Sequence, residues 1–205
     1  AESAKRTPAP SQQINLTDPD SALMRKSKHS GYEQAYNAQA VVDADGSQLI
    51  VAVDVLQTPA DSNQLATAVH SVPAEVGEVQ RALADGGYVN AEEFDQLKTE
   101  NVDLYVAVSG EDPNKRKYDF RPPRERPRKK VTDARLVGMR DKVASAEGKR
   151  IYARRAATVE PVFGIIKGAL GFRQFLLRGI EKVKLEWGLV CLAYDFRRLW
   201  RLSEG

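Results

Sequence analysis

Apolar and polar positions near the start of the chain predict an antiparallel hairpin. Residues 36–42 alternate well enough for a strand, and residues 49–56 are almost wholly apolar. Between them, Asp43-Ala44-Asp45-Gly46 is typical of a turn. We therefore expect a hairpin whose second strand is buried on both faces. A short strand over residues 14–18 precedes it and ends at Pro19.

After the hairpin, segments with a helical pattern alternate with segments with a strand pattern up to about residue 108. Asp61 and Ser62 are candidate N-caps for a helix that carries Leu65, Val69 and Val72. A strand over residues 79–84 follows, and Asn90 then caps a helix with Glu93 as its capping-box partner. Residues 102–108 form the last predicted strand. The polar residues 22–32 read as a loop.

The second half of the chain predicts helices behind a basic insertion. Residues 110–148 are polar, basic and proline-containing, with a short helix expected at 134–144. The helical period returns at Tyr152, where Val159, Phe163, Ile166 and Leu170 share one face. A final helix is expected over residues 181–202.

This order of elements predicts an α/β fold, in which a mixed sheet of about five strands is flanked by helices. It is the order of the ribonuclease-H-like fold, with the basic insertion before the helix that carries Glu160. We expect one such domain over residues 13–205, and a disordered linker over residues 1–12, which are rich in Pro, Ser, Ala and Gln.

Composition narrows the class of protein. No apolar run approaches the roughly 20 residues of a membrane span, and there is no signal-peptide pattern. The single cysteine, Cys191, and the two histidines, His29 and His70, are too few for a zinc site. We expect a reducing, cytoplasmic setting. Because the chain does not begin with methionine, we also expect it to be a fragment of a longer protein.

Positive charge is concentrated although the net charge is only +3. Nine Lys or Arg residues lie between Lys115 and Lys130, among them Arg128, Lys129 and Lys130, and Arg154 and Arg155 follow later. Such clusters suit a polyanion, because each phosphate contact releases counterions. A solvated surface loop is the alternative interpretation of the same residues.

Three acids occupy three different local settings. Asp18 ends the first predicted strand, Asp85 ends the strand over residues 79–84, and Glu160 opens an amphipathic helix. In the expected fold the strands that carry Asp18 and Asp85 are neighbours, and the helix brings Glu160 over them. Carboxylates that converge in this way suit a pair of Mg²⁺ or Mn²⁺ ions. We therefore predict a metal site for chemistry on phosphodiesters.

Each acid also has a simpler interpretation. Asp85 precedes Gly86-Gly87 and is also typical of a turn, while Glu160 is also a first-turn helix acid. Asp20 competes with Asp18 for the same role. Asp43, Asp45 and Asp61 are interpreted as turn and cap residues, with metal contact as the less favoured alternative. Lys167 lies two helical turns after Glu160 on the same face, either to contact a DNA phosphate or simply in solvent.

At these residues the chain resembles bacterial insertion-sequence DDE transposases. The matching stretches are Asn15-Leu16-Thr17-Asp18-Pro19-Asp20-Ser21, Tyr36 to Asp43, Leu83-Ala84-Asp85-Gly86-Gly87-Tyr88, Tyr152 to Lys167 and Phe172 to Gly179. The signature around the glutamate is kept between Glu160 and Lys167. Tyr152 and Arg155 keep their mutual spacing but lie one residue further from Glu160 than in the family pattern.

The resemblance implies a catalytic domain that cuts DNA at insertion-element ends and joins it to a target with Mg²⁺. It implies Asp18, Asp85 and Glu160 as catalytic acids and metal ligands, DNA as partner, a homodimer in the DNA complex, and a bacterial, nucleoid-associated location. We also expect an N-terminal DNA-binding region to be missing. The alternatives are a nuclease of the same fold, which does not join strands, and an inactive remnant that only binds DNA.

Overall fold

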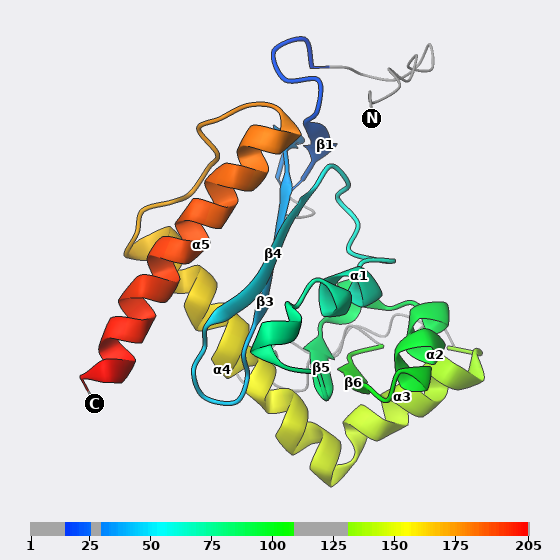
Figure 1. Cartoon of the computed structure of the whole chain (residues 1–205). Coiled ribbons are helices and arrows are strands. Elements are labelled where there is room, and N and C mark those ends of the chain that lie inside the picture. The colour runs from blue at the N-terminus through cyan, green and yellow to red at the C-terminus, as the bar shows by residue number, and fades with distance from the viewer. Residues whose placement is uncertain (1–14, 26–29, 109–130, 205) are drawn as a thin grey trace, which may run out of the picture.

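The computed structural model describes residues 15–25, 30–108 and 131–204. An antiparallel hairpin of β3 (Asn37–Val42) and β4 (Ile50–Leu56) runs through the middle of the molecule, with α5 (Ile180–Ser203) on one face (Figure 1). Around it lie the other described strands and α-helices: β1 (Ala22–Met24), β2 (Glu33–Ala35), α1 (Leu65–His70), β5 (Arg81–Ala84), α2 (Ala91–Thr99), β6 (Asp103–Val106), α3 (Ala134–Ala144) and α4 (Ala146–Gly168). Strand β1 pairs with β2 in antiparallel fashion, and β5 pairs with β6 in parallel.

One face of β3 is apolar and the other is polar, because successive side chains along a strand point to opposite faces. Tyr36, just before β3, and the alanines and valine that follow at every second position pack into the core beneath α5. The centre of that core is Trp187, whose indole N–H donates to the carbonyl of Gln39 at 2.8 Å. Asn37 and Gln39 therefore lie on the opposite face, where α1 contacts β3.

A second core lies between α1, α2 and the parallel pair β5–β6. Leu97 and Val106 are completely buried there. As predicted, Asn90 caps α2: its side-chain oxygen accepts from the backbone N–H groups of Glu92 and Glu93. The expected capping box is not formed, because the Glu93 carboxylate turns away and accepts from the backbone N–H of Ala66 at 3.0 Å.

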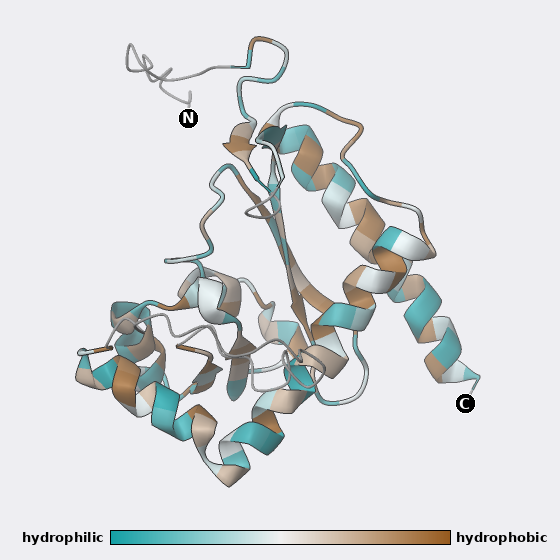
Figure 2. Ribbon diagram, turned by 180° about the vertical axis from the view of Figure 1, so that it is seen from behind, coloured by the Kyte–Doolittle hydropathy of each residue, from teal (hydrophilic) through white to brown (hydrophobic). Residues whose placement is uncertain are grey.

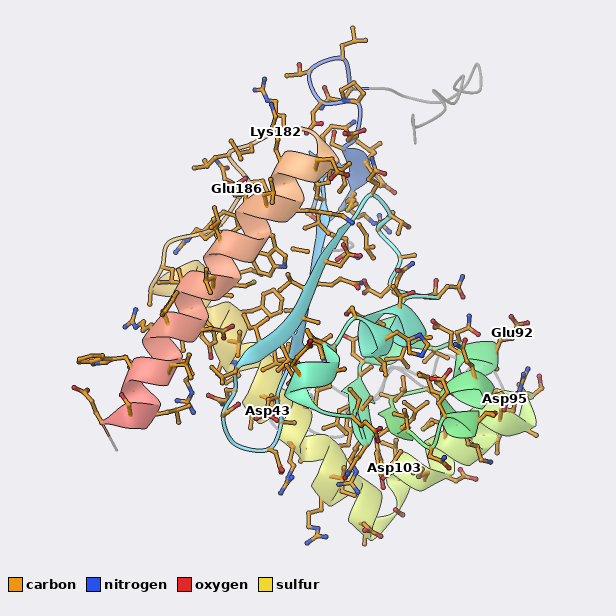
Figure 3. All side chains as sticks on the ribbon, in the orientation of Figure 1. Asp43, Glu92, Asp95, Asp103, Lys182 and Glu186 are labelled. Carbon is orange, nitrogen blue, oxygen red and sulfur yellow. The ribbon has the colours of Figure 1, made fainter. Side chains whose placement is uncertain are left out.

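Helices α3 and α4 meet at a tight corner that depends on a glycine. Ser145 caps α4 by accepting from the N–H of Gly148. A Cβ on Gly148 would lie 1.9 Å from the carbonyl oxygen of Lys142, so only glycine fits. On the β6 side, Lys142 and Arg81 both donate to Asp103, which ties α3 to the parallel pair. Asp103 is labelled in Figure 3, close to the corner of α3 and α4.

Helix α4 links the two cores. Its first half packs Ile151 and Tyr152 against Tyr105 of β6, and its second half packs Val162 and Ile166 beneath α5 (Figure 1). Between these halves lies Pro161, which has no N–H to donate to the carbonyl of Ala157. The side chain of Gln48, from the β3–β4 turn, donates to that carbonyl at 2.8 Å instead. The hairpin thus supports α4 next to Glu160.

Several sequence-based predictions need correction. Within the described residues the strands form three separate pairs, so a single ribonuclease-H-like sheet of five strands is not confirmed. Residues 15–18 are not a strand, because Ser21 donates its backbone N–H to the Asp18 carbonyl in a turn. Strand β4 is not buried on both faces, since Val53 is exposed.

The remaining expectations agree in part. The helix predicted over residues 134–144 coincides with α3, the last helix with α5, and α4 starts earlier than Tyr152. The proposed linker over residues 1–12 and most of the basic insertion lie outside the described residues. Of the helices in the described part of the chain, none is long and apolar enough to cross a membrane.

Candidate active site

Asp85 lies where strand β5 ends, at the carboxyl edge of the parallel pair. Its carboxylate oxygen Oδ1 accepts from the backbone N–H of Gly87 at 2.8 Å, which fixes the short helical turn Gly86–Tyr88. Its other oxygen, Oδ2, accepts from a guanidinium nitrogen of Arg155 at 3.0 Å. Carboxyl edges of parallel strands are the usual binding position in open α/β sheets. Asp85, with a side chain 46% exposed, is thus oriented and still accessible.

Helix α4 is docked on this strand end by two neighbouring side chains. The hydroxyl of the buried Tyr152 donates to the carbonyl of Ala84 at 3.2 Å, and Arg155, one turn later, reaches Asp85. Because Arg155 is only 20% exposed at its side chain, its ion pair with Asp85 is shielded from solvent more than a surface pair. Tyr152 and Arg155, whose mutual spacing matches the family pattern, therefore both contact the end of β5 at Ala84 and Asp85.

A second carboxylate, that of Asp61, lies next to Asp85. A Cβ built on Gly87 would be 2.9 Å from Asp61 Oδ2 and 3.0 Å from Asp85 Oδ1, so those oxygens are no further apart than the sum of these distances. Asp61 was interpreted from the sequence as a helix cap. The structure instead gives α1 the N-cap Gln64, without any side-chain cap, and turns the Asp61 carboxylate toward β3 and Asp85.

The pKa of Tyr88 is affected by the charges of Asp61 and Asp85. Burial raises the pKa of its hydroxyl above the ordinary value, and the negative charges of Asp61 and Asp85 raise it further, while Arg155 lowers it. The phenol therefore stays protonated at neutral pH beside two carboxylates.

Asp18 lies on the other face of the hairpin. Its two carboxylate oxygens both accept from the hydroxyl of Tyr36 at 2.8 Å, and Oδ1 also accepts from the backbone N–H of Gly179. Tyr36 belongs to the α5 side of β3, whereas Asp61 is bound by residues on the opposite side. Asp20 likewise accepts from the N–H of Ile180, at the first turn of α5. In this structure, both acids support the start of α5.

Glu160 is exposed on α4, five residues after Arg155. Five residues correspond to about 7.5 Å along the helix axis and about 140° around it, so Glu160 and Arg155 point to different sides. Within the described part of the chain, no three acidic, histidine or cysteine side chains are close enough to share a metal ion. The structure thus brings Asp85 and Asp61 together, and leaves Asp18 and Glu160 apart from this pair.

The chain matches a known protein family over most of its length. The family described as transposase DDE domain matches residues 6–196. The chain belongs to the transposase DDE domain family. This confirms the resemblance read from the sequence, and the general activity of the family is DNA cleavage in transposition. No curated protein and no solved structure matched the chain.

The predicted DNA-binding residues of this transposase domain are distributed over α4 and the insertion. Arg154 is exposed and pairs loosely with Asp45 at 3.7 Å. Lys167 is exposed, with its ammonium 5.4 Å from the centre of the Phe163 ring. Arg155 is engaged by Asp85. Arg128, Lys129 and Lys130 lie outside the described residues.

The sequence offered one overlooked signal for Asp61. Asn37 and Gln39 are polar residues two positions apart in an otherwise apolar strand, so they share one face. Their amides donate to Asp61 Oδ1 at 2.6 and 3.1 Å. Two amides on a strand face predict a polar partner opposite them, but the sequence does not say which residue it is.

Proposed function

We propose that this chain is the catalytic domain of an insertion-element transposase that cuts DNA strands and joins them to a target with the help of Mg²⁺ or Mn²⁺. The observation that carries the proposal is Asp85 at the carboxyl end of β5, oriented by Gly87 and Arg155 in a chain of the transposase DDE family. The nuclease and DNA-binding alternatives share this geometry, but they lack the joining step.

The residues present fit a divalent cation. Asp85 and Asp61 supply hard oxygen atoms, and the space between them is kept free of side chain by Gly87. A divalent cation held by Asp85 and Asp61 would supply activation of a water or 3′-hydroxyl nucleophile and stabilisation of the leaving oxygen of a phosphodiester. The metal dependence is thus supported by the donor set at the strand end.

The chain's own residues have distinct roles in this proposal. Asp85 presents its carboxylate to the reacting phosphate region, and Glu160 reaches it from α4 when DNA is bound. Arg154, Lys167 and the basic insertion with Arg128, Lys129 and Lys130 bind phosphates of the DNA backbone, which increases affinity without reading sequence. The predicted role of Asp18 as first acid requires it to leave Tyr36 and Gly179, and Asp20 would have to leave Ile180.

A homodimer in the DNA complex is also part of the proposal. Five apolar residues are exposed on α5 and recur at alternating spacings of four and three residues: Leu185, Leu189, Leu192, Phe196 and Leu199. This is the spacing of a helix seam that packs against a second helix. Hydrophobic positions recur along the whole of α5 in Figure 2. We propose that a second copy of this chain packs against this seam, because a seam of this kind is complementary to itself. A DNA substrate also implies a location with access to the nucleoid.

The activity is tested with a supercoiled plasmid that carries the DNA flanking this chain's gene. In Mg²⁺ or Mn²⁺, the wild-type chain should nick or cut it, and Asp85→Asn and Glu160→Gln should reduce cleavage to the background level. Glu92→Gln, an exposed acid on α2, is the matched control and should cleave as wild type. Circular dichroism confirms that each variant is folded.

Two outcomes decide between the functions. Undiminished cleavage by either the Asp85 or the Glu160 variant contradicts the assignment of the catalytic acids. A labelled, pre-cleaved element end separates transposition from hydrolysis: joining of the label to target DNA supports a transposase, and cleavage without joining supports a nuclease.

A further inference from the structure

We propose that Asp61 is a metal ligand beside Asp85, so that the divalent cation is held by this pair of carboxylates rather than by Asp18 and Asp85. The inference rests on the proposed metal-dependent function and adds Asp61 to the residues that bind the metal. Asp61 lies in the segment between β4 and α1, on the face of β3 that Asn37 and Gln39 share.

The first argument is the space between the two carboxylates. A Cβ on Gly87 would lie 2.9 Å from Asp61 Oδ2 and 3.0 Å from Asp85 Oδ1, so both carboxylates would have to shift to admit it. Both oxygens therefore border the same small volume, which a glycine leaves open. Two carboxylate oxygens around such a volume provide the ligand type that Mg²⁺ and Mn²⁺ prefer.

The second argument is the orientation of Asp61. Oxygen Oδ1 accepts from the amides of Asn37 and Gln39, so Oδ2 is the oxygen turned toward Gly87 and Asp85. In the described part of the chain no hydrogen bond to Oδ2 is present. Metal-binding carboxylates are commonly oriented by hydrogen bonds to their other oxygen, and Asn37 and Gln39 provide that support.

The third argument is charge. Carboxylates this close repel each other unless a cation lies near. Arg155 neutralises Asp85, but no Lys or Arg of the described residues forms an ion pair with Asp61. The amides that hold Asp61 are neutral, so they orient its charge without compensating it. One negative charge is left uncompensated at an accessible site, which favours binding of a cation.

A purely structural role explains Asp61 less well. Its backbone carbonyl, not its carboxylate, accepts from Gln64 N–H at the start of α1. The carboxylate therefore does not cap the helix. In contrast, both carboxylate oxygens of Asp18 accept hydrogen bonds, and the residue is only 8% exposed to solvent, as expected for a structural carboxylate.

The test is calorimetric titration of the full chain with Mn²⁺, which reads metal binding without DNA or turnover. Asp61→Asn keeps an acceptor for Asn37 and Gln39 but removes the negative charge. We expect it to weaken Mn²⁺ binding at least about tenfold, since even outer partners of metal sites cost 10–100-fold. Asp85→Asn should weaken binding similarly, and Asp18→Asn should leave it unchanged.

Gly87→Ala provides an independent variant, because it fills the space between the carboxylates without changing charge. It should also reduce Mn²⁺ affinity. Gly164→Ala is its control, since nothing lies within 4 Å of a Cβ at that position on α4. Thermal unfolding without metal shows whether each variant folds, and the increase in melting temperature on adding Mn²⁺ should disappear in Asp61→Asn.

The outcomes are distinguishable. If Asp85→Asn loses Mn²⁺ binding and a folded Asp61→Asn binds as wild type, the inference about Asp61 is overturned while the proposed function stands. If the wild-type chain does not bind Mn²⁺, or Asp85→Asn binds it normally, both are overturned. If Asp18→Asn alone loses binding, the pair of ligands is assigned wrongly.

Discussion

At the scale of single residues, the structure separates acids that organise the fold from acids that are available for chemistry. Asp18 is buried and bound by Tyr36 and Gly179, whereas Asp85 and Asp61 each direct an oxygen toward the Cβ position of Gly87. The sequence singled out Asp85 because it ends an apolar strand of the expected sheet. It favoured a cap role for Asp61 over metal contact, because the position of Asp61 beside Asp85 arises only when the β4–α1 segment packs against β3, and the polar pair Asn37 and Gln39 does not say which residue lies opposite.

Tyr36→Phe tests the structural role of Asp18. Removing the hydroxyl leaves a buried carboxylate with only the Gly179 N–H, so the free energy of unfolding at pH 7 should fall by about 1–3 kcal/mol in urea titrations. Burial, followed by the hydrogen bond and charge of Asp18, raises the pKa of Tyr36. The contribution is therefore present below about pH 10 and is lost as the pH rises through the raised pKa.

Tyr32→Phe is the control for this prediction, because Tyr32 is 62% exposed. It should change stability by less than about 0.5 kcal/mol. Equal stability of Tyr36→Phe and wild type at pH 7 would show that the Tyr36–Asp18 contact does not support the fold.

At the scale of elements, helices were more predictable than strand pairing. Residues 134–144 form α3 as predicted, because Asp133 caps a segment with a local helical period. The grouping of strands depends on contacts between distant segments, and here β5 and β6 pair only with each other. The early strand over residues 14–18 was wrong for a local reason: the side chain of Asn15 accepts from Thr17 N–H and favours a turn.

Helix α5 gives the prediction for this scale, because it has apolar residues on two opposite sides. Val183, Trp187, Cys191 and Tyr194 face the hairpin core, while the seam that includes Leu189 and Leu192 is exposed. Leu189→Lys should reduce the mass of the DNA complex, measured by light scattering, from two copies to one. Leu176→Lys, an exposed leucine outside α5, should leave two copies. A wild-type complex with one copy contradicts the dimer.

At the scale of the whole molecule, the β3–β4 hairpin separates two regions. Asp18 and α5 lie on one side, and Asp61, Asp85 and the parallel pair lie on the other. Helix α4 belongs to both, since it packs beneath α5 and also places Arg155 on Asp85. The family match, which spans residues 6–196, includes both regions. Under the proposed function, Glu160 would approach Asp85 through a shift of α4, the helix that also holds Arg155 at Asp85.

The most direct measurement is anomalous diffraction from crystals of the chain soaked with Mn²⁺. We expect manganese within about 2.1 Å of an oxygen of Asp85, with Asp61 as its neighbouring carboxylate and Arg155 displaced or shifted. Manganese bound only at Asp18 or Asp20, or none at Asp85 in crystals that hold it elsewhere, would contradict a phosphodiester-cleaving metal site at the end of β5.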